Sequence, residues 1–167
     1  MDNLDLINYW NVVLMLFVGY LLGSIPSSVW IGKALHNTDV REHGSMNAGA
    51  TNTFRVLGKS VGTAVLILDV LKGFFAVYFV RTLLDNTTYQ VNPNLWLILA
   101  GIMAVIGHLY PVFAGFRGGK GVATSLGMVL CIHPEAALCA LGVFILIFIS
   151  TGYVSAGSII ASLSFPV

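Results

Sequence analysis

Residues 61–80 read VGTAVLILDVLKGFFAVYFV, and this stretch decides the fold class. A helix needs about 20 apolar residues to cross the hydrocarbon core of a bilayer, and this run is long enough. Its charged residues, Asp69 and Lys72, are three positions apart near the middle, where an unpaired charge is costly. We therefore expect a transmembrane helix in which Asp69 and Lys72 neutralise each other. In the alternative, Lys72 leans toward a substrate phosphate.

The rest of the chain has the same apolar character. Of its 167 residues, 57% are hydrophobic and 9% are charged, which leaves too little polar surface to cover a soluble globule. We expect an all-α, polytopic transmembrane helical bundle that forms one domain over residues 1–167. The further apolar stretches are 10–31, 95–113, a short helix at 122–132, 136–150, and a final segment from about Tyr153 to Val167.

Charge sets the expected orientation and excludes one class of partner. The acidic N-terminus lacks a signal-peptide pattern, so the first span is expected to be retained. Most basic residues near the span ends belong to the first and third connections, where they are Lys33, Arg41, Arg55, Lys59, Arg117 and Lys120. Because cytoplasmic connections are enriched in Lys and Arg, these two should be cytoplasmic and the N-terminus outside. A net charge of +1 without a basic cluster argues against a nucleic-acid partner.

The first connection has the composition of an anion site. A helix that begins near Gly49 would place Thr51 and Arg55, four residues apart, on one face. Ser45 and Asn47 would then lie just before its N-terminus. An anion at this point would meet free backbone N–H groups, hydroxyl donors and a guanidinium.

The third connection repeats this logic in the stretch Gly115-Phe-Arg-Gly-Gly-Lys-Gly-Val-Ala-Thr124. Its glycines, Gly118, Gly119 and Gly121, allow close approach of the backbone, Lys120 supplies a charge, and a helix should follow at once. Lys120 is followed by Gly rather than by Ser or Thr, so this is not a nucleotide-hydrolysing Walker A loop. For each connection the alternative is a flexible turn whose basic residues only set the topology or touch lipid headgroups.

Two further residues carry open alternatives. Pro26 should kink the first helix and free the carbonyl of Leu22, and we expect Ser24 to satisfy such a carbonyl; a catalytic role is the alternative. His108 is expected to be a buried, hydrogen-bonded side chain that braces the following loop. Its alternative is a role as general base.

Together these motifs resemble the bacterial acyl-phosphate:glycerol-3-phosphate acyltransferases of phospholipid synthesis. They occur in that family's order and cover most of residues 20–125. The matching pieces are Gly23-Ser-Ile-Pro26, Gly44-Ser-Met-Asn-Ala-Gly-Ala-Thr-Asn-Thr-Phe-Arg55, Leu68-Asp-Val-Leu-Lys-Gly73, Gly107-His-Leu-Tyr-Pro-Val-Phe113 and Phe116-Arg-Gly-Gly-Lys-Gly-Val-Ala-Thr124.

The resemblance implies a seven-helix bundle in the bacterial cytoplasmic membrane with its active site on the cytoplasmic side. The implied reaction moves a fatty acyl group from acyl phosphate to the 1-hydroxyl of glycerol 3-phosphate, giving lysophosphatidic acid and phosphate, without metal or cofactor. It also implies functional coupling to an enzyme that produces acyl phosphate.

By motif position, the resemblance assigns the catalytic roles to Ser45, Arg55 and Lys120. The residues expected to bind substrate or phosphate are Asn47, Gly49, Thr51, Asn52, Gly118, Gly119, Gly121, Thr124 and Ser158, with support from Ser24, Asp69, Lys72 and His108. The family usually continues into a cytoplasmic tail with a His-Arg-x-Asn-type motif, and we expect this chain to lack that segment.

Two other classes of function remain as alternatives. A small membrane transporter or channel for an ion or a phosphorylated solute would use Asp69, Lys72 and His108 as an intramembrane path. It would concentrate polar groups at mid-membrane on inverted repeats, whereas here they concentrate in two connections on one predicted side. A purely structural membrane subunit would not need paired anion-binding loops.

Overall fold

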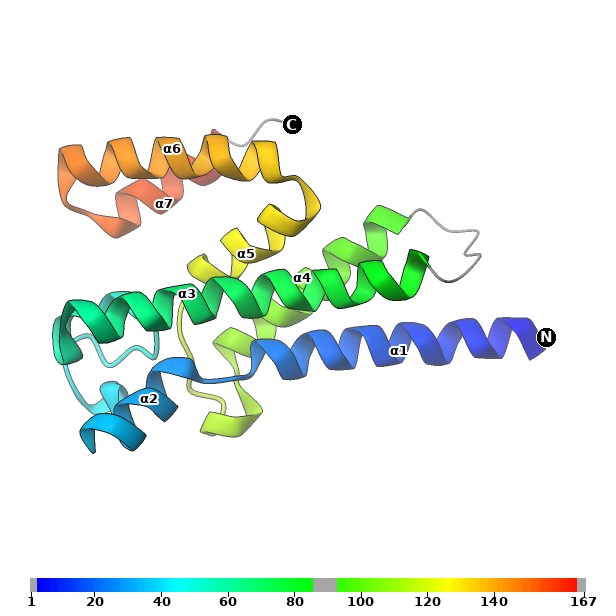
Figure 1. The fold of residues 1–167 in the computed structure, drawn as a ribbon, viewed down its shortest axis with the longest axis horizontal. Coiled ribbons are helices and arrows are strands. Elements are labelled where there is room, and N and C mark those ends of the chain that lie inside the picture. Colours follow the sequence, from blue (N-terminus) through cyan, green and yellow to red (C-terminus); the bar gives the residue numbers. More distant parts are fainter. Residues whose placement is uncertain (1–2, 86–92, 165–167) are drawn as a thin grey trace.

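The computed structural model describes residues 3–85 and 93–164, and the regular structure of these residues is entirely helical (Figure 1). Among the described residues, four segments are long and apolar enough to cross a membrane: 10–36, 50–84, 93–114 and 134–151. The polytopic all-α prediction is therefore confirmed. The elements are α1 (Asn3–Gly23), α2 (Ser27–His36), η1 (Val40–Glu42), α3 (Ala50–Asp85), α4 (Pro93–Leu109), η2 (Val112–Ala114), α5 (Val122–Ile132), α6 (Pro134–Thr151) and α7 (Val154–Leu163).

The first span breaks where a kink was expected. Helix α1 ends at Gly23, and α2 starts at Ser27. Pro26 has no N–H and cannot continue the helical ladder, so residues 24–26 form a break. The prediction for Ser24 is wrong: its Oγ atom is buried without a hydrogen-bond partner among the described residues, and the carbonyl of Leu22 accepts from the N–H of Ile25 at 3.3 Å.

Helix α3 is interrupted at Gly58. This residue has φ 86° and ψ 179°, a backbone conformation that essentially only glycine adopts. The interruption separates a short N-terminal segment, residues 50–57, from the apolar part that can span the membrane. The segment before Gly58 carries the polar residues that were predicted to face an anion.

Helices α1, α3 and α4 run alongside one another and enclose the main core (Figure 1). Their core residues include Met15, Val77 and Leu97, all nearly fully buried. Helices α1 and α4 approach closely because glycines line the contact: a Cβ atom at Gly23 would lie 2.0 Å from the carbonyl oxygen of Ala104. Small residues permit this kind of backbone approach in membrane bundles, where packing rather than water drives association.

Helix α5 matches the predicted short helix, with bounds Val122–Ile132, and packs on α3 and α4. It is too short to span a bilayer, and it lies against other protein. Helices α6 and α7 form a hairpin, and α6 packs against α5 (Figure 1). Residues 165–167 of the predicted last segment lie outside the described residues.

Candidate functional site

The first connection is folded around Asn52, in the first turn of α3. This residue is 1% exposed. Its Oδ1 atom accepts a hydrogen bond from the Ser45 N–H at 2.8 Å, and its Nδ2 atom donates to the carbonyls of Val40 at 2.7 Å and His43 at 3.1 Å. Gly44 has φ +59°, and a Cβ atom there would lie 2.4 Å from Oδ1 of Asn52. The side-chain amide of Asn52 therefore holds the backbone of the first connection in place.

The predicted anion-facing residues lie at the beginning of α3. The helix begins at Ala50, which confirms the expected start to within one residue. Thr51 and Arg55 are exposed on the segment before Gly58, and Ser45 is exposed in the loop. Asn47 and Gly49 are half-buried just before the helix. The hydroxyls of Ser45 and Thr51 and the guanidinium of Arg55 are therefore accessible near the N-terminus of α3.

The second Gly-rich connection folds back on the end of α4. The N–H of Gly118 donates to the carbonyl of Leu109 and that of Gly119 to the carbonyl of His108, both at 3.1 Å. No side chain fits at Gly119, because a Cβ atom there would lie 2.1 Å from Nε2 of His108. Gly121 has φ +80° and precedes α5, and Lys120 beside it is exposed. These glycines thus let the backbone approach α4, with Lys120 left free to face outward.

The two connections meet directly. The N–H of Ala48 donates to the carbonyl of Gly118 at 3.3 Å, and Oγ of Ser28 donates to the Ala48 carbonyl at 2.8 Å. Arg41 adds a second link, since its guanidinium donates to the carbonyl of Ala114 at 2.6 Å. Our sequence reasoning did not single out Arg41 as a site residue. The sequence feature that could have indicated its role is Asp39, two positions before it. The carbonyl that Arg41 binds is 73 residues away in the chain.

Behind the loops, Asp69 and Lys72 form a buried ion pair. Nζ of Lys72 lies 2.9 Å from Oδ1 of Asp69 and donates to the carbonyl of Ile25, also at 2.9 Å. Ser27 donates to the same Asp69 oxygen at 3.3 Å. The predicted mutual neutralisation is confirmed. With both ion-pair partners buried and engaged, the geometry favours this interpretation over a contact between Lys72 and substrate.

His108 lies between the ion pair and the Gly-rich third connection. It is 5% exposed, and its Nδ1 atom lies 3.7 Å from Oδ1 of Asp69. Its carbonyl accepts from Gly119, and its Nε2 atom packs against that glycine. The predicted hydrogen bond at Nδ1 is wrong, because this buried atom has no hydrogen-bond partner among the described residues. The packing on Gly119 favours the bracing role over that of a general base.

Thr124 and Ser158 are in different surroundings from the loops. Thr124 is fully buried, its backbone packs against Gly73 of α3, and its Oγ1 atom has no partner among the described residues. Ser158 is on α7, where its hydroxyl donates to the carbonyl of Ser155 at 3.0 Å. The binding roles predicted for these two residues stay predictions.

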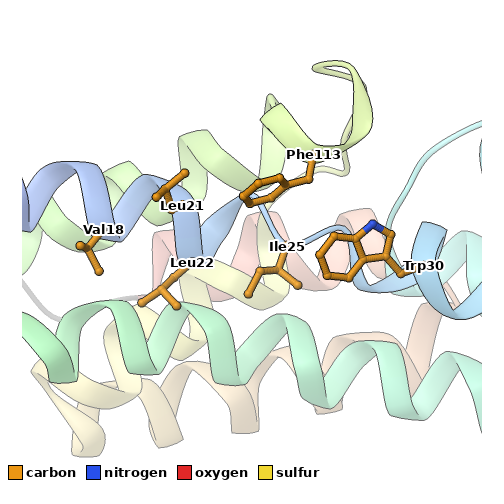
Figure 2. A pocket seen from close by; sticks show the side chains of 6 residues that line it. All are labelled: Val18, Leu21, Leu22, Ile25, Trp30 and Phe113. Atoms are coloured by element: carbon orange, nitrogen blue, oxygen red, sulfur yellow. The ribbon is translucent and has the colours of Figure 1, made fainter.

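An apolar groove of about 430 Å³ runs along α1 to the start of the third connection (Figure 2). Its walls come from α1, the break after it, α2 and η2. It has no polar lining, and Phe113 at one end lies five residues before Gly118. The lining residues are Val18, Leu21, Leu22, Ile25, Trp30 and Phe113.

Within residues 3–85 and 93–164, no group of three or more His, Cys, Asp or Glu side chains is close enough to hold a metal ion.

Comparison with known proteins places this geometry in context. The family profile described as glycerol-3-phosphate acyltransferase matches residues 13–167. A glycerol-3-phosphate acyltransferase of Chlorobium phaeobacteroides is 44% identical over 162 residues, which are 95% of this chain and 69% of the relative.

Two solved structures have the same fold. Both are crystal structures of PlsY, an integral membrane glycerol 3-phosphate acyltransferase, and both are 39% identical to this chain. The glycerol 3-phosphate form has a TM-score of 0.81 and covers 93% of this chain and 79% of the solved one. The lysophosphatidic acid form has a TM-score of 0.77, with coverages of 92% and 72%.

Proposed function

This chain belongs to the glycerol-3-phosphate acyltransferase family, and from that premise we propose that it acylates the 1-hydroxyl of glycerol 3-phosphate with acyl phosphate as donor. The products are lysophosphatidic acid and inorganic phosphate. The observation that carries the proposal is the meeting of two Gly-rich, basic connections, joined from Ala48 to Gly118, in a multi-pass bacterial membrane enzyme. Two phosphate-binding loops side by side suit a reaction between two phosphorylated substrates. The solved relatives in glycerol 3-phosphate and lysophosphatidic acid forms support the acceptor and the product.

The roles follow from the chemistry of each loop. Ser45, Asn47, Thr51 and Arg55 surround the N-terminus of α3 and bind one phosphate through hydrogen bonds and charge. Lys120 neutralises the other phosphate, which lies against the backbone of residues 118–121. Together the loops align the two substrates and balance their anionic charge, which are the main requirements of this reaction.

The transfer step is direct. Acyl phosphate is a mixed anhydride, so its carbonyl carbon is already activated. The glycerol 1-oxygen bonds to that carbon, the bond from carbon to the phosphate oxygen breaks, and phosphate leaves with the electron pair. The hydroxyl proton goes to a substrate phosphate or a nearby group. Ser45 therefore acts by hydrogen bonding and forms no acyl-enzyme.

The apolar groove of Figure 2 suits the acyl tail. It is lined by carbon side chains, and Phe113 at one end leads into the loop that carries Lys120. A tail in this groove would have its phosphate near residues 118–121. Burial of methylene groups there is favourable at about 0.8 kcal/mol each.

We place the loops on the cytoplasmic side of the bacterial cytoplasmic membrane, with the N-terminus outside. The basic residues of the first and third connections support this orientation. Acyl phosphate is reactive and would be supplied by a functionally coupled enzyme that makes it on the same side.

Acyl transfer from labelled palmitoyl phosphate to glycerol 3-phosphate tests the proposal, with palmitoyl-CoA as the donor control. The purified chain should form lysophosphatidic acid only from the phosphate donor, and Lys120→Ala and Arg55→Ala should lose transfer. Lys59→Ala is the matched control because it removes an exposed cation from α3 outside the site, and it should keep activity. Transfer from palmitoyl-CoA, full activity in either site variant, or a stable acyl group trapped on Ser45 would contradict the proposal.

A further inference from the structure

Arg41 links two parts of the chain that are far apart in sequence. It lies in η1, four residues before Ser45. Its Nη1 atom donates to the carbonyl of Ala114 at 2.6 Å and approaches the carbonyl of Arg117 at 3.5 Å. Those carbonyls belong to the segment that leads directly into Gly118 and Lys120. One side chain of the first connection is thus bonded to the third connection.

Asp39 fixes the guanidinium in this position. Its Oδ1 atom accepts from Nε of Arg41 at 3.0 Å and its Oδ2 atom from Nη2 at 2.8 Å, a two-bond fork. Oδ1 also accepts from the Arg41 N–H at 3.0 Å, and Nζ of Lys33 lies 3.1 Å from Oδ2. A planar guanidinium can make this fork and still reach a third partner, whereas an ammonium cannot.

Each member of the pair stabilises the charged form of the other. Hydrogen bonds from Arg41 hold the pKa of Asp39 well below its usual value, and Asp39 raises the pKa of Arg41. The side chains are only 14% and 8% exposed for Arg41 and Asp39, so solvent competes weakly for these bonds. The hydrogen bonds of the guanidinium go to Asp39 and to loop carbonyls, which suits a positioning role rather than a contact with substrate.

We propose that Arg41, held by Asp39, is a positioning residue that sets the distance between the two phosphate-binding loops. The inference rests on the proposed function, in which each loop binds one phosphorylated substrate. Acyl transfer requires the acceptor oxygen close to the donor carbonyl, and a misplacement of about 1 Å can cost on the order of 100-fold in rate. Besides Arg41, the direct loop-to-loop backbone bond is the 3.3 Å contact from Ala48 to Gly118.

Kinetics and a distance measurement on the full chain test this role. Arg41→Met removes the fork and the cross-loop bonds and should lower kcat/KM about 100-fold, with KM raised for both glycerol 3-phosphate and palmitoyl phosphate. Arg41→Lys keeps the charge without the fork and should recover part of the loss. Leu97→Ala is the control for lost stability, because it opens a cavity in the core of α1, α3 and α4. It should lower the unfolding temperature and leave both KM values unchanged.

The distance measurement does not depend on turnover. Spin labels at Met46→Cys and Phe116→Cys, two exposed loop positions, report the loop separation when Cys131 and Cys139 are replaced by Ala and Ser. The spin-labelled protein that keeps Arg41 should show one narrow distance distribution. Arg41→Met should broaden this distribution, and Arg41→Lys should broaden it less.

The outcomes separate the two proposals. A distribution that stays narrow in Arg41→Met, or kinetic constants equal to those of the wild type, would overturn the positioning role. A wild-type chain that makes no lysophosphatidic acid from acyl phosphate would overturn the proposed function. In that case the distance distributions alone decide whether Arg41 sets the loop separation.

Discussion

Two acid–base pairs in this molecule differ in what surrounds them. Asp39 and Arg41 are two residues apart in the first connection, and Arg41 also binds backbone carbonyls of the third connection. Asp69 and Lys72 are three residues apart on α3, buried at 2% and 5% side-chain exposure, and Lys72 binds the carbonyl at the break between α1 and α2. In both pairs the acid holds the cation, and the cation's remaining donors join distant segments.

The difference is one of energy and of function. In the membrane interior, the attraction within an ion pair must first offset the large desolvation cost of both charges. Replacing both residues by neutral ones therefore costs little stability, whereas replacing only one leaves an unpaired buried charge and costs much. In the partly exposed loop the desolvation cost of the charges is smaller. The main contribution of this pair is the fixed position that it gives to the two loops. The buried pair is therefore expected to govern stability, and the loop pair to govern substrate alignment.

Dividing the buried pair should have the largest effect. Lys72→Met leaves the Asp69 carboxylate in the interior without its cation, and we expect a loss of about 3–5 kcal/mol in the free energy of unfolding. Reversible SDS-induced unfolding in mixed micelles measures the loss. Asp69→Asn combined with Lys72→Met should recover more than half of it, because no uncompensated charge remains. Equal losses in the single and double variants would show that the charges are not what stabilises this region.

The contact between the buried region and the second loop should have the next largest effect. A methyl group at Gly119 would lie 2.1 Å from Nε2 of His108 and 3.2 Å from the carbonyl oxygen of Ala48. Gly119→Ala should therefore cost about 1–3 kcal/mol through overpacking, and should also weaken transfer. Gly142→Ala is the matched control, since a Cβ atom there meets nothing within 4 Å. Unfolding in micelles and the transfer assay should show no loss for it; similar behaviour of both variants would argue against the packing of Gly119 on His108.

The loop pair should show a smaller, pH-dependent effect on stability. Asp39 has a folded-state pKa below its ordinary 3.8, so its stabilising contribution is complete above that value and is lost as pH falls below it. Asp39→Asn should cost about 1 kcal/mol near neutral pH. The difference from the wild type should shrink below about pH 4, because the Asp39 carboxyl takes up a proton in the unfolded chain before it does so in the folded protein. Thermal unfolding of both proteins from pH 6 to pH 3 gives the curves, and parallel curves throughout would rule out the depressed pKa.

The smallest effect is expected from the outer hydrogen bond of the buried pair. Ser27→Ala removes a 3.3 Å bond to Asp69, while Lys72 continues to pair with the same oxygen. We expect a loss of about 0.5 kcal/mol in the free energy of unfolding and no change in KM. A loss as large as that of Lys72→Met would mean that Ser27, rather than Lys72, is the main partner of Asp69.

The fold class and the two Gly-rich connections could be predicted from local sequence patterns. Runs of apolar residues long enough for a bilayer predict spanning helices, because lipid offers the backbone no hydrogen-bond partners other than its own. Local patterns also predict the short helix at 122–132 and the helix start near Gly49. Gly-rich turns and the polar residues at 133–135 interrupt the apolar runs at these points. The pairing of Asp69 with Lys72 followed from a spacing that helical geometry brings together.

The contacts between distant segments could not be predicted from the sequence, because they depend on how the helices pack. Local pattern could not show that Asn52 binds three backbone groups of its own loop, that Thr124 is fully buried, or that Pro26 ends α1 outright. Arg41 was overlooked because its partner carbonyl is 73 residues away. Such contacts depend on which backbones approach each other in the packed bundle. Glycines such as Gly23 and Gly119 permit this close approach. A glycine in the sequence indicates that a close contact is possible there, but it does not identify the segment that makes the contact.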